Sequence, residues 1–283
     1  MVNLDDVKTQ ELDYNKKEEA LEILNRFKDK YLHGKIEGLL DFSFWDIMTD
    51  DEFNKGPMDG YHFDGDRTKI VYAIDYLLYH NEINKLSLGN ASDGMNFSGD
   101  TINTFRTLFG NRFTRTEEIV ERNLNFDKKQ IDAKNNFFRT YQRIGNFYIL
   151  PNGKYSDTTI NKYRGTYKEY KDFFDIFLRV LYTDKDKILT SLKQTESNSD
   201  FFKKYSSKEQ FCELFFLQDY ENLDYNHPST KNGSRCNYQY FSSLGISSEV
   251  YKEFAFNYIK MATDLINKRS ERIVRKLKND YKL

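Results

Sequence analysis

A long apolar stripe at helical spacing near the C-terminus constrains the fold of this chain most strongly. From about residue 248 to 281, apolar side chains recur at intervals that place them on one face of a continuous helix. The pattern predicts one long helix, and its final part is basic. The stripe comprises Val250, Phe254, Ile259, Ala262, Leu265, Ile266, Ile273 and Leu277.

Other segments show the same period. Residues 17–32 carry apolar side chains on one face, and Gly34 is placed to end that helix. Residues 167–182 have a wide apolar face, which indicates a core helix. The apolar run at 70–79 suits a buried helix, although its periodicity also allows a strand.

Two capping boxes mark further helix starts. Thr114 with Glu117, and Ser207 with Gln210, have the spacing at which each side chain satisfies the other's free backbone donor. Strand patterns are scarce, limited to residues 147–150 and parts of 38–63. The sequence therefore predicts a mainly α fold, α-rich α+β, with a small β-hairpin or short sheet.

No internal repeat and no linker rich in Pro or Gly divides the chain. We therefore expect residues 1–283 to form a single domain that includes the long C-terminal helix. Aromatic residues make up 16% of the sequence, so rings are expected to fill much of the core. Cys212 lies among apolar neighbours and is expected to be a small buried hydrophobe.

Charge and hydropathy narrow the class of protein. The formal net charge is -1, which argues against a protein that coats nucleic acid through bulk positive charge. No apolar run approaches the roughly 18–20 residues that a membrane helix needs, and the start of the chain has no signal-peptide core. We expect a soluble cytoplasmic protein without a membrane segment.

The segment from Arg139 to Gly165, RTYQRIGNFYILPNGKYSDTTINKYRG, holds the most unusual local chemistry. It departs from helix and strand periods, and Pro151, Asn152 and Gly153 suit a tight turn after a short strand. The segment then places hydroxyl, amide and guanidinium groups within one or two turns.

These groups suit the binding of a phosphate or carboxylate. The predicted ligand-binding residues are Arg143, Asn146, Asn161 and Arg164. The structural alternative is that the asparagines hydrogen-bond irregular backbone while the arginines pair with acidic neighbours.

An enzyme is the alternative to a binding protein. GNFYILPN followed by TINKYRG resembles one half of HNH-type endonuclease modules. Such nucleases need a histidine base and metal ligands, and the chain has no histidine between His80 and His227. An enzyme acting on a phosphorylated or nucleic-acid substrate would instead draw on Asp64, Asp66 and His80 as catalytic candidates.

Each of these candidates also has an ordinary structural reading. The acidic residues lie among glycines and suit a solvated turn better than a cation site, so no metal site is predicted. His80 suits a hydrogen-bonded helix end. Neither GxGxxG nor GxxxxGK[ST] occurs, and no cofactor is predicted.

The basic end of the predicted C-terminal helix could dock an acidic partner. Cations near a helix C-terminus are also favoured by the helix dipole, so a solvated face is the simpler interpretation. The basic residues are Lys268, Arg269, Arg272, Arg275, Lys276, Lys278 and Lys282.

An ordered set of short segments resembles a bacterial domain-of-unknown-function family. The segments are DFSFWD at 41–46, DGD at 64–66, LLYH at 77–80, SGDTINTF at 98–105, RIGNFYILPN at 143–152, TINKYRG at 159–165 and FFLQDY at 215–220. The resemblance implies a single intracellular bacterial domain and supplies no catalytic residue. The best prediction is a binding protein for an anionic small molecule or a macromolecular partner.

Overall fold

The computed structural model describes residues 4–53, 65, 68–82, 95–96, 101–102, 108–109, 115–147, 149–151, 207–220, 245 and 247–283. Helices dominate this part of the chain. The elements are α1 (Leu4–Tyr31), η1 (Ile36–Leu40), η2 (Phe44–Ile47), α2 (Lys69–Tyr79), β1 (Met95–Asn96), α4 (Arg115–Leu124), α5 (Lys128–Tyr141), η4 (Ile144–Asn146), β2 (Leu150–Pro151), α10 (Lys208–Leu214), η6 (Gln218–Tyr220) and α12 (Ser248–Tyr281).

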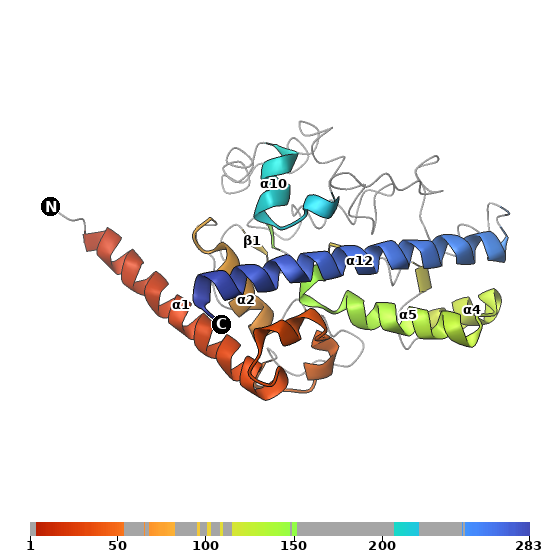
Figure 1. Cartoon of the computed structure of the whole chain (residues 1–283), viewed down its shortest axis with the longest axis horizontal. Helices are drawn as coiled ribbons and strands as arrows, with labels where there is room; N and C mark the ends of the chain where they lie inside the picture. Colours follow the sequence, from red (N-terminus) through yellow and green to blue (C-terminus); the bar gives the residue numbers. More distant parts are fainter. Residues whose placement is uncertain are drawn as a thin grey trace.

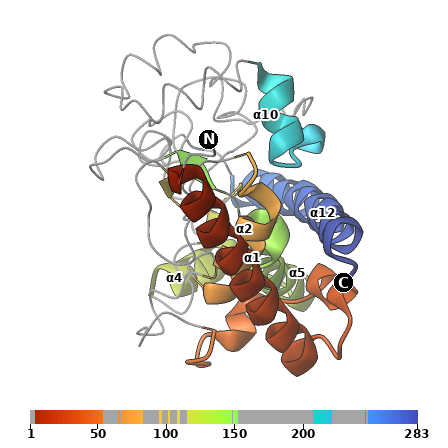
Figure 2. The same ribbon diagram turned by 90° about the vertical axis from the view of Figure 1, so that its left-hand side faces the viewer.

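The long helix α12 is the axis of the structure. α4 and α5 lie along its N-terminal half, while η1 and α2 contact it elsewhere (Figure 1). α1 packs on α2 and crosses in front of it in the end-on view of Figure 2. Because α12 contacts elements from both halves of the sequence, it joins them into one core.

The stripe on α12 is buried as its period predicts, with one exception. Phe254, Leu265 and Ile273 are buried, whereas Val250 in the first turn is 52% exposed. Ser247 caps this end of the helix, its side chain accepting a hydrogen bond from the backbone of Val250. The first turn therefore extends beyond the core that covers the rest of the stripe.

The helix at 70–79 is confirmed, and the strand alternative is wrong. Thr68 caps α2 by accepting a hydrogen bond from the backbone N–H of Val71. Every residue from Ile70 to Tyr79 is buried, so this helix is covered on all sides.

Three other predicted features have clear outcomes. α1 matches the predicted helix at 17–32 except that it begins earlier and ends one residue sooner, at Tyr31, before Gly34, which has φ +74°. Ser207 and Gln210 form the predicted capping box. Cys212 is buried, as its apolar neighbours indicate. Thr114 and the predicted helix at 167–182 lie outside the described residues.

The mainly helical class is confirmed, but the β structure is smaller than predicted. β1 and β2 pair antiparallel over two residues each, with Met95 opposite Pro151 and Asn96 opposite Leu150. These strands are far apart in the sequence, so the pair is not the predicted hairpin. The described part of 38–63 forms 3-10 turns where short strands were expected, because Phe44 and Ile47 fold inward to the core.

A buried lysine fastens α5 to α4. Lys134 is almost fully buried, and its Nζ lies 2.5 Å from Oε1 of Glu117 and also pairs with Glu121. Two carboxylates compensate one buried ammonium, which would otherwise be costly to remove from water. This contact holds α4 and α5 together although both helices are rich in charged residues.

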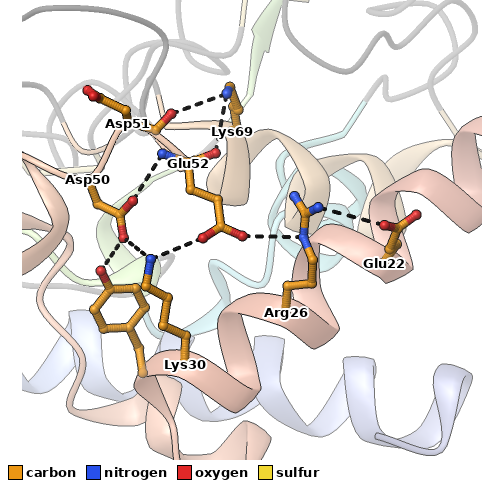
Figure 3. A network of polar contacts seen from close by, with 8 residues as sticks. Glu22, Arg26, Lys30, Asp50, Asp51, Glu52 and Lys69 are labelled. Atoms are coloured by element: carbon orange, nitrogen blue, oxygen red, sulfur yellow. Dashed lines mark hydrogen bonds and ion pairs between the residues drawn. The ribbon is translucent and has the colours of Figure 1, made fainter.

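A surface network of ion pairs links α1 to the turn before α2 (Figure 3). Lys30 lies 2.9 Å from Asp50 and 3.0 Å from Glu52, and Arg26 bridges Glu52 and Glu22. Such exposed pairs contribute little individually, on the order of 0–1 kcal/mol each. Their effect is to hold the register of α1 on the aromatic core beneath it.

The backbones of η4 and α12 approach each other closely at Gly145. A Cβ on Gly145 would lie 2.0 Å from the carbonyl oxygen of Ile266 and 2.4 Å from Oγ of Ser270. The backbone N–H of Gly145 donates a 3.1 Å hydrogen bond to that hydroxyl. Only glycine fits here, because the obstruction is backbone that cannot move aside.

We predict that Gly145→Ala destabilises the protein by about 3 kcal/mol, since overpacking against a helix backbone forces η4 away from α12. Gly245→Ala is the control. Gly245 has φ +71° but open space around it, so its cost is limited to about 1 kcal/mol of backbone strain. Urea unfolding of both variants measures the difference, and equal losses would show that close packing at Gly145 is unimportant.

Candidate functional site

η4 and the residues around it form the centre of the candidate site. This segment lies between the C-terminal end of α5 and the middle of α12 (Figure 1). Part of the unusual stretch starting at Arg139 is more regular than predicted, because residues 139–141 are the last turn of α5. The irregular part begins at Gln142.

Asn146 uses its whole side-chain amide within the protein. Its Oδ1 accepts hydrogen bonds from Oγ1 of Thr101 at 2.8 Å and from the backbone of Ile102 at 2.9 Å. Its Nδ2 donates to the carbonyls of Ile102 at 3.0 Å and Tyr141 at 2.9 Å. An amide has two donors and two acceptor positions, so all four are occupied. Asn146 thus ties the 101–102 segment to the end of α5.

Arg269 on α12 is the second centre of this region, and it is fully buried. Its Nε donates to the carbonyl of Phe215 at 2.8 Å. Its Nη1 lies 2.8 Å from the carbonyl of Gly145, 2.5 Å from that of Phe147 and 3.4 Å from that of Ile144. One guanidinium therefore connects three separate segments of the chain.

Two further polar residues are buried beside Arg269. Asp75 and Tyr79 lie one turn apart on α2. Burial raises the pKa of both groups, that of Asp75 well above its ordinary value, and the positive charge of Arg269 opposes this rise only in part.

These three side chains are not fully hydrogen-bonded. Asp75 Oδ2, Tyr79 OH and Arg269 Nη2 are buried without a hydrogen-bond partner in the described part of the chain. Tyr79 and Arg269 therefore lie near each other, but their geometry is not that of a hydrogen bond. No sequence pattern groups these three residues. A lone acid inside the apolar run IVYAIDYLLY was the available signal, whereas Arg269 was grouped with the solvated basic residues of the C-terminal helix.

Arg143 is positioned at the edge of the core. Its Nη1 donates to Oδ1 of Asn267 at 2.9 Å and lies 3.3 Å from Oδ1 of Asp41. The Arg143 side chain is 18% exposed, whereas that of Asp41 is 90% exposed. Arg139, nearby on α5, forms a two-point pair with Asp46. Both arginines thus have acidic neighbours.

His80 ends α2. Its Nδ1 lies 2.9 Å from the carbonyl oxygen of Tyr76, and the two rings stack with centroids 5.1 Å apart. These are the contacts of the helix-end histidine described above. Asp64, Asp66, Asn161 and Arg164 lie outside the described residues, so the distances that would join the candidates into one cavity are not defined.

Acidic neighbours neutralise most of the basic end of α12. Lys268 pairs with Asp264 at 2.7 Å and Lys276 with Asp280 at 2.8 Å. Arg272 pairs with Asp219, and Lys278 pairs with Glu37. Together with the buried Arg269, five of the seven basic residues are occupied within the fold.

A groove of about 860 Å³ lies between α5 and the first half of α12. Its α5 wall includes Ala133, Phe137 and Thr140, and its α12 wall includes Phe256, Lys260 and Thr263. Its size is in the range typical of small-molecule sites. No sequence pattern predicts this groove, because its walls come from two helices that are far apart in the chain.

The described residues lack a metal-binding cluster and a membrane-spanning helix. No three His, Cys, Asp or Glu side chains in these ranges are grouped so that they could hold a metal ion. None of the helices that the structure describes combines the length and apolar character required to cross a bilayer.

The fold and its central contacts define a mainly helical domain organised on one long helix, without a recognised catalytic arrangement among the described residues. The chain belongs to the family described as "Family of unknown function (DUF6994)", whose family model matches residues 74–273. No curated protein and no solved structure matches it. The predicted resemblance to a domain-of-unknown-function family is confirmed, although the segments at 41–46 and 64–66 precede the matched region.

The buried acid Asp75 predicts a pH effect on stability. Its pKa is raised in the folded state, so its favourable contribution is complete below the unfolded value near pH 4 and is lost as pH rises through the folded pKa. Asp75→Asn does not titrate. We therefore expect its stability relative to the natural protein to increase with pH, by at most about 1.4 kcal/mol per pH unit for one proton.

Urea unfolding of both proteins between pH 4 and pH 8 measures this difference. Asp132→Asn, at an exposed position on α5, is the matched control and should show no such trend. A pH-independent difference between Asp75→Asn and the natural protein would contradict the assignment.

Proposed function

We propose that this chain is a single-domain binding protein for an anionic small molecule, with Arg143 as the residue that anchors the anion. Asn161 and Arg164 are proposed from the sequence to complete the site. Asn146 supports it by holding the backbone on which Arg143 is displayed. A cytoplasmic location is part of the same proposal.

The observation that carries the proposal is the state of the Arg143 guanidinium. Asn267 on α12 fixes the orientation of the guanidinium through a hydrogen bond. The acidic neighbour is Asp41, whose Oδ1 lies 3.3 Å from Nη1 of Arg143 and whose side chain is almost entirely exposed. An ion pair with so exposed a partner is worth little, on the order of 0–1 kcal/mol. A ligand carboxylate or phosphate can therefore replace Asp41 at small cost and gain a planar, two-point contact with arginine.

The other two roles have less support. An acidic macromolecular partner would dock on the basic end of α12, where most cations already have acidic partners within the chain. An enzyme acting on a phosphorylated or nucleic-acid substrate would use Asp64, Asp66 and His80, and its histidine is bonded to the end of its own helix. Both roles stay predictions from the sequence.

Thermal unfolding of the full chain in acetate or inorganic phosphate, at constant ionic strength set with chloride, tests the anion site. A ligand at 100 times its Kd should stabilise the folded protein by about 2.7 kcal/mol. We expect Arg143→Gln to abolish this shift without unfolding the protein, and Arg164→Ala to act in the same way.

Arg139→Gln is the matched control, because it removes the same charge from a guanidinium that is already occupied by Asp46. It should retain the anion-induced shift. If the natural protein and Arg143→Gln are stabilised equally by both anions, Arg143 is not the anchor and the proposal fails.

A further inference from the structure

The groove between α5 and α12 has its last lining residue on each wall one turn before the Arg143–Asn267 pair. Thr263 lines the groove, and Asn267 follows it by four positions, one turn further along the same face of α12. Thr140 lines the other wall, and the backbone N–H of Arg143 still donates to the carbonyl of Thr140 at 3.0 Å. Arg143 donates to Asn267, so this pair follows the groove at its Thr140 and Thr263 end, although neither residue is part of the lining.

The body of the groove is apolar. Phe137 and Ile259 belong to the buried core and form part of its lining, and the partly buried ring of Phe256 adds to them. At the far end lies Val250, the large hydrophobic side chain that is 52% exposed. From Asp127 to Thr140 the α5 wall is about 20 Å long, at roughly 1.5 Å per residue. A small inorganic anion would use none of this surface.

Charge is distributed unevenly along the groove. Lys260 lines it one turn before Thr263, and no ion pair links it to any residue that the structure describes. The opposite end carries Asp127, Glu249 and Glu253 together with Lys129 and Lys252, and Lys252 is already paired with Glu249 at 2.7 Å. An anionic group is therefore favoured at the Arg143 end.

We propose that the ligand of the Arg143 site is an amphipathic carboxylate, whose headgroup binds Arg143 and whose hydrocarbon chain lies in the groove between α5 and α12. This inference rests on the proposed anion site and names its ligand class. The cation at one end selects the head, and the apolar walls select a chain.

The test is titration calorimetry of the full chain with three probes: acetate, octanoate and 1-octanol. Octanoate is expected to bind at least tenfold more tightly than acetate, because only its chain reaches the apolar walls. It should also bind at least tenfold more tightly than 1-octanol, which lacks the charge that Arg143 recognises.

Two variants assign the chain and the head. Ala133→Trp fills the groove and should remove the advantage of octanoate over acetate, whereas Asp132→Trp, one position away and exposed outside the lining, should retain it. Arg143→Gln should weaken both carboxylates. The comparison of probes on the natural protein remains decisive if Ala133→Trp does not fold.

The outcomes distinguish a failure of the groove proposal from a failure of the proposed anion site. If acetate and octanoate bind equally and both depend on Arg143, the anion site stands and the groove is not its continuation. If 1-octanol binds as tightly as octanoate, the head assignment is overturned. If neither carboxylate depends on Arg143, both proposals fail together.

Discussion

The buried guanidinium of Arg269 is the interaction on which the rest of the structure depends. Removing an arginine from water is expensive, and the cost is offset only where its donors meet acceptors. Here the acceptors are backbone carbonyls of η4, of the residue after it and of the end of α10. These carbonyls belong to irregular segments, so Arg269 supplies the hydrogen bonds that helices and sheets supply elsewhere.

This arrangement explains why the candidate site lies where it does. Arg269 and Ser270 hold η4 against α12, and the absence of a side chain at Gly145 allows the backbones to approach. Asn146 then fixes the adjoining 101–102 segment with its complete set of hydrogen bonds. Arg143, one turn before, is thereby held at the edge of the core, where the proposed anion would meet an oriented cation with little loss of side-chain entropy.

The local elements were largely predictable and their contacts were not. The stripe of α12 and the capping box at Ser207 depend on residues close in sequence, so their spacing was sufficient. Arg269 was grouped with the basic residues of a solvated helix face, because the carbonyls that accept its hydrogen bonds are more than fifty positions away in the sequence. The 3-10 turns at η1 and η2 were missed for a similar reason, since it is the tertiary core, and not local propensity, that draws Phe44 inward.

By itself the sequence determined the helical class, the bounds of α12 and the place of the irregular η4 segment, because hydrophobic period, caps and glycine act over one or two turns. Tertiary structure alone decided which arginine is buried and which is displayed. Arg143 and Arg269 have the same chemistry, and only packing separates the residue that holds the fold from the one that is proposed to bind an anion. The groove beside Arg143 is likewise a product of two helices meeting, which no local pattern encodes.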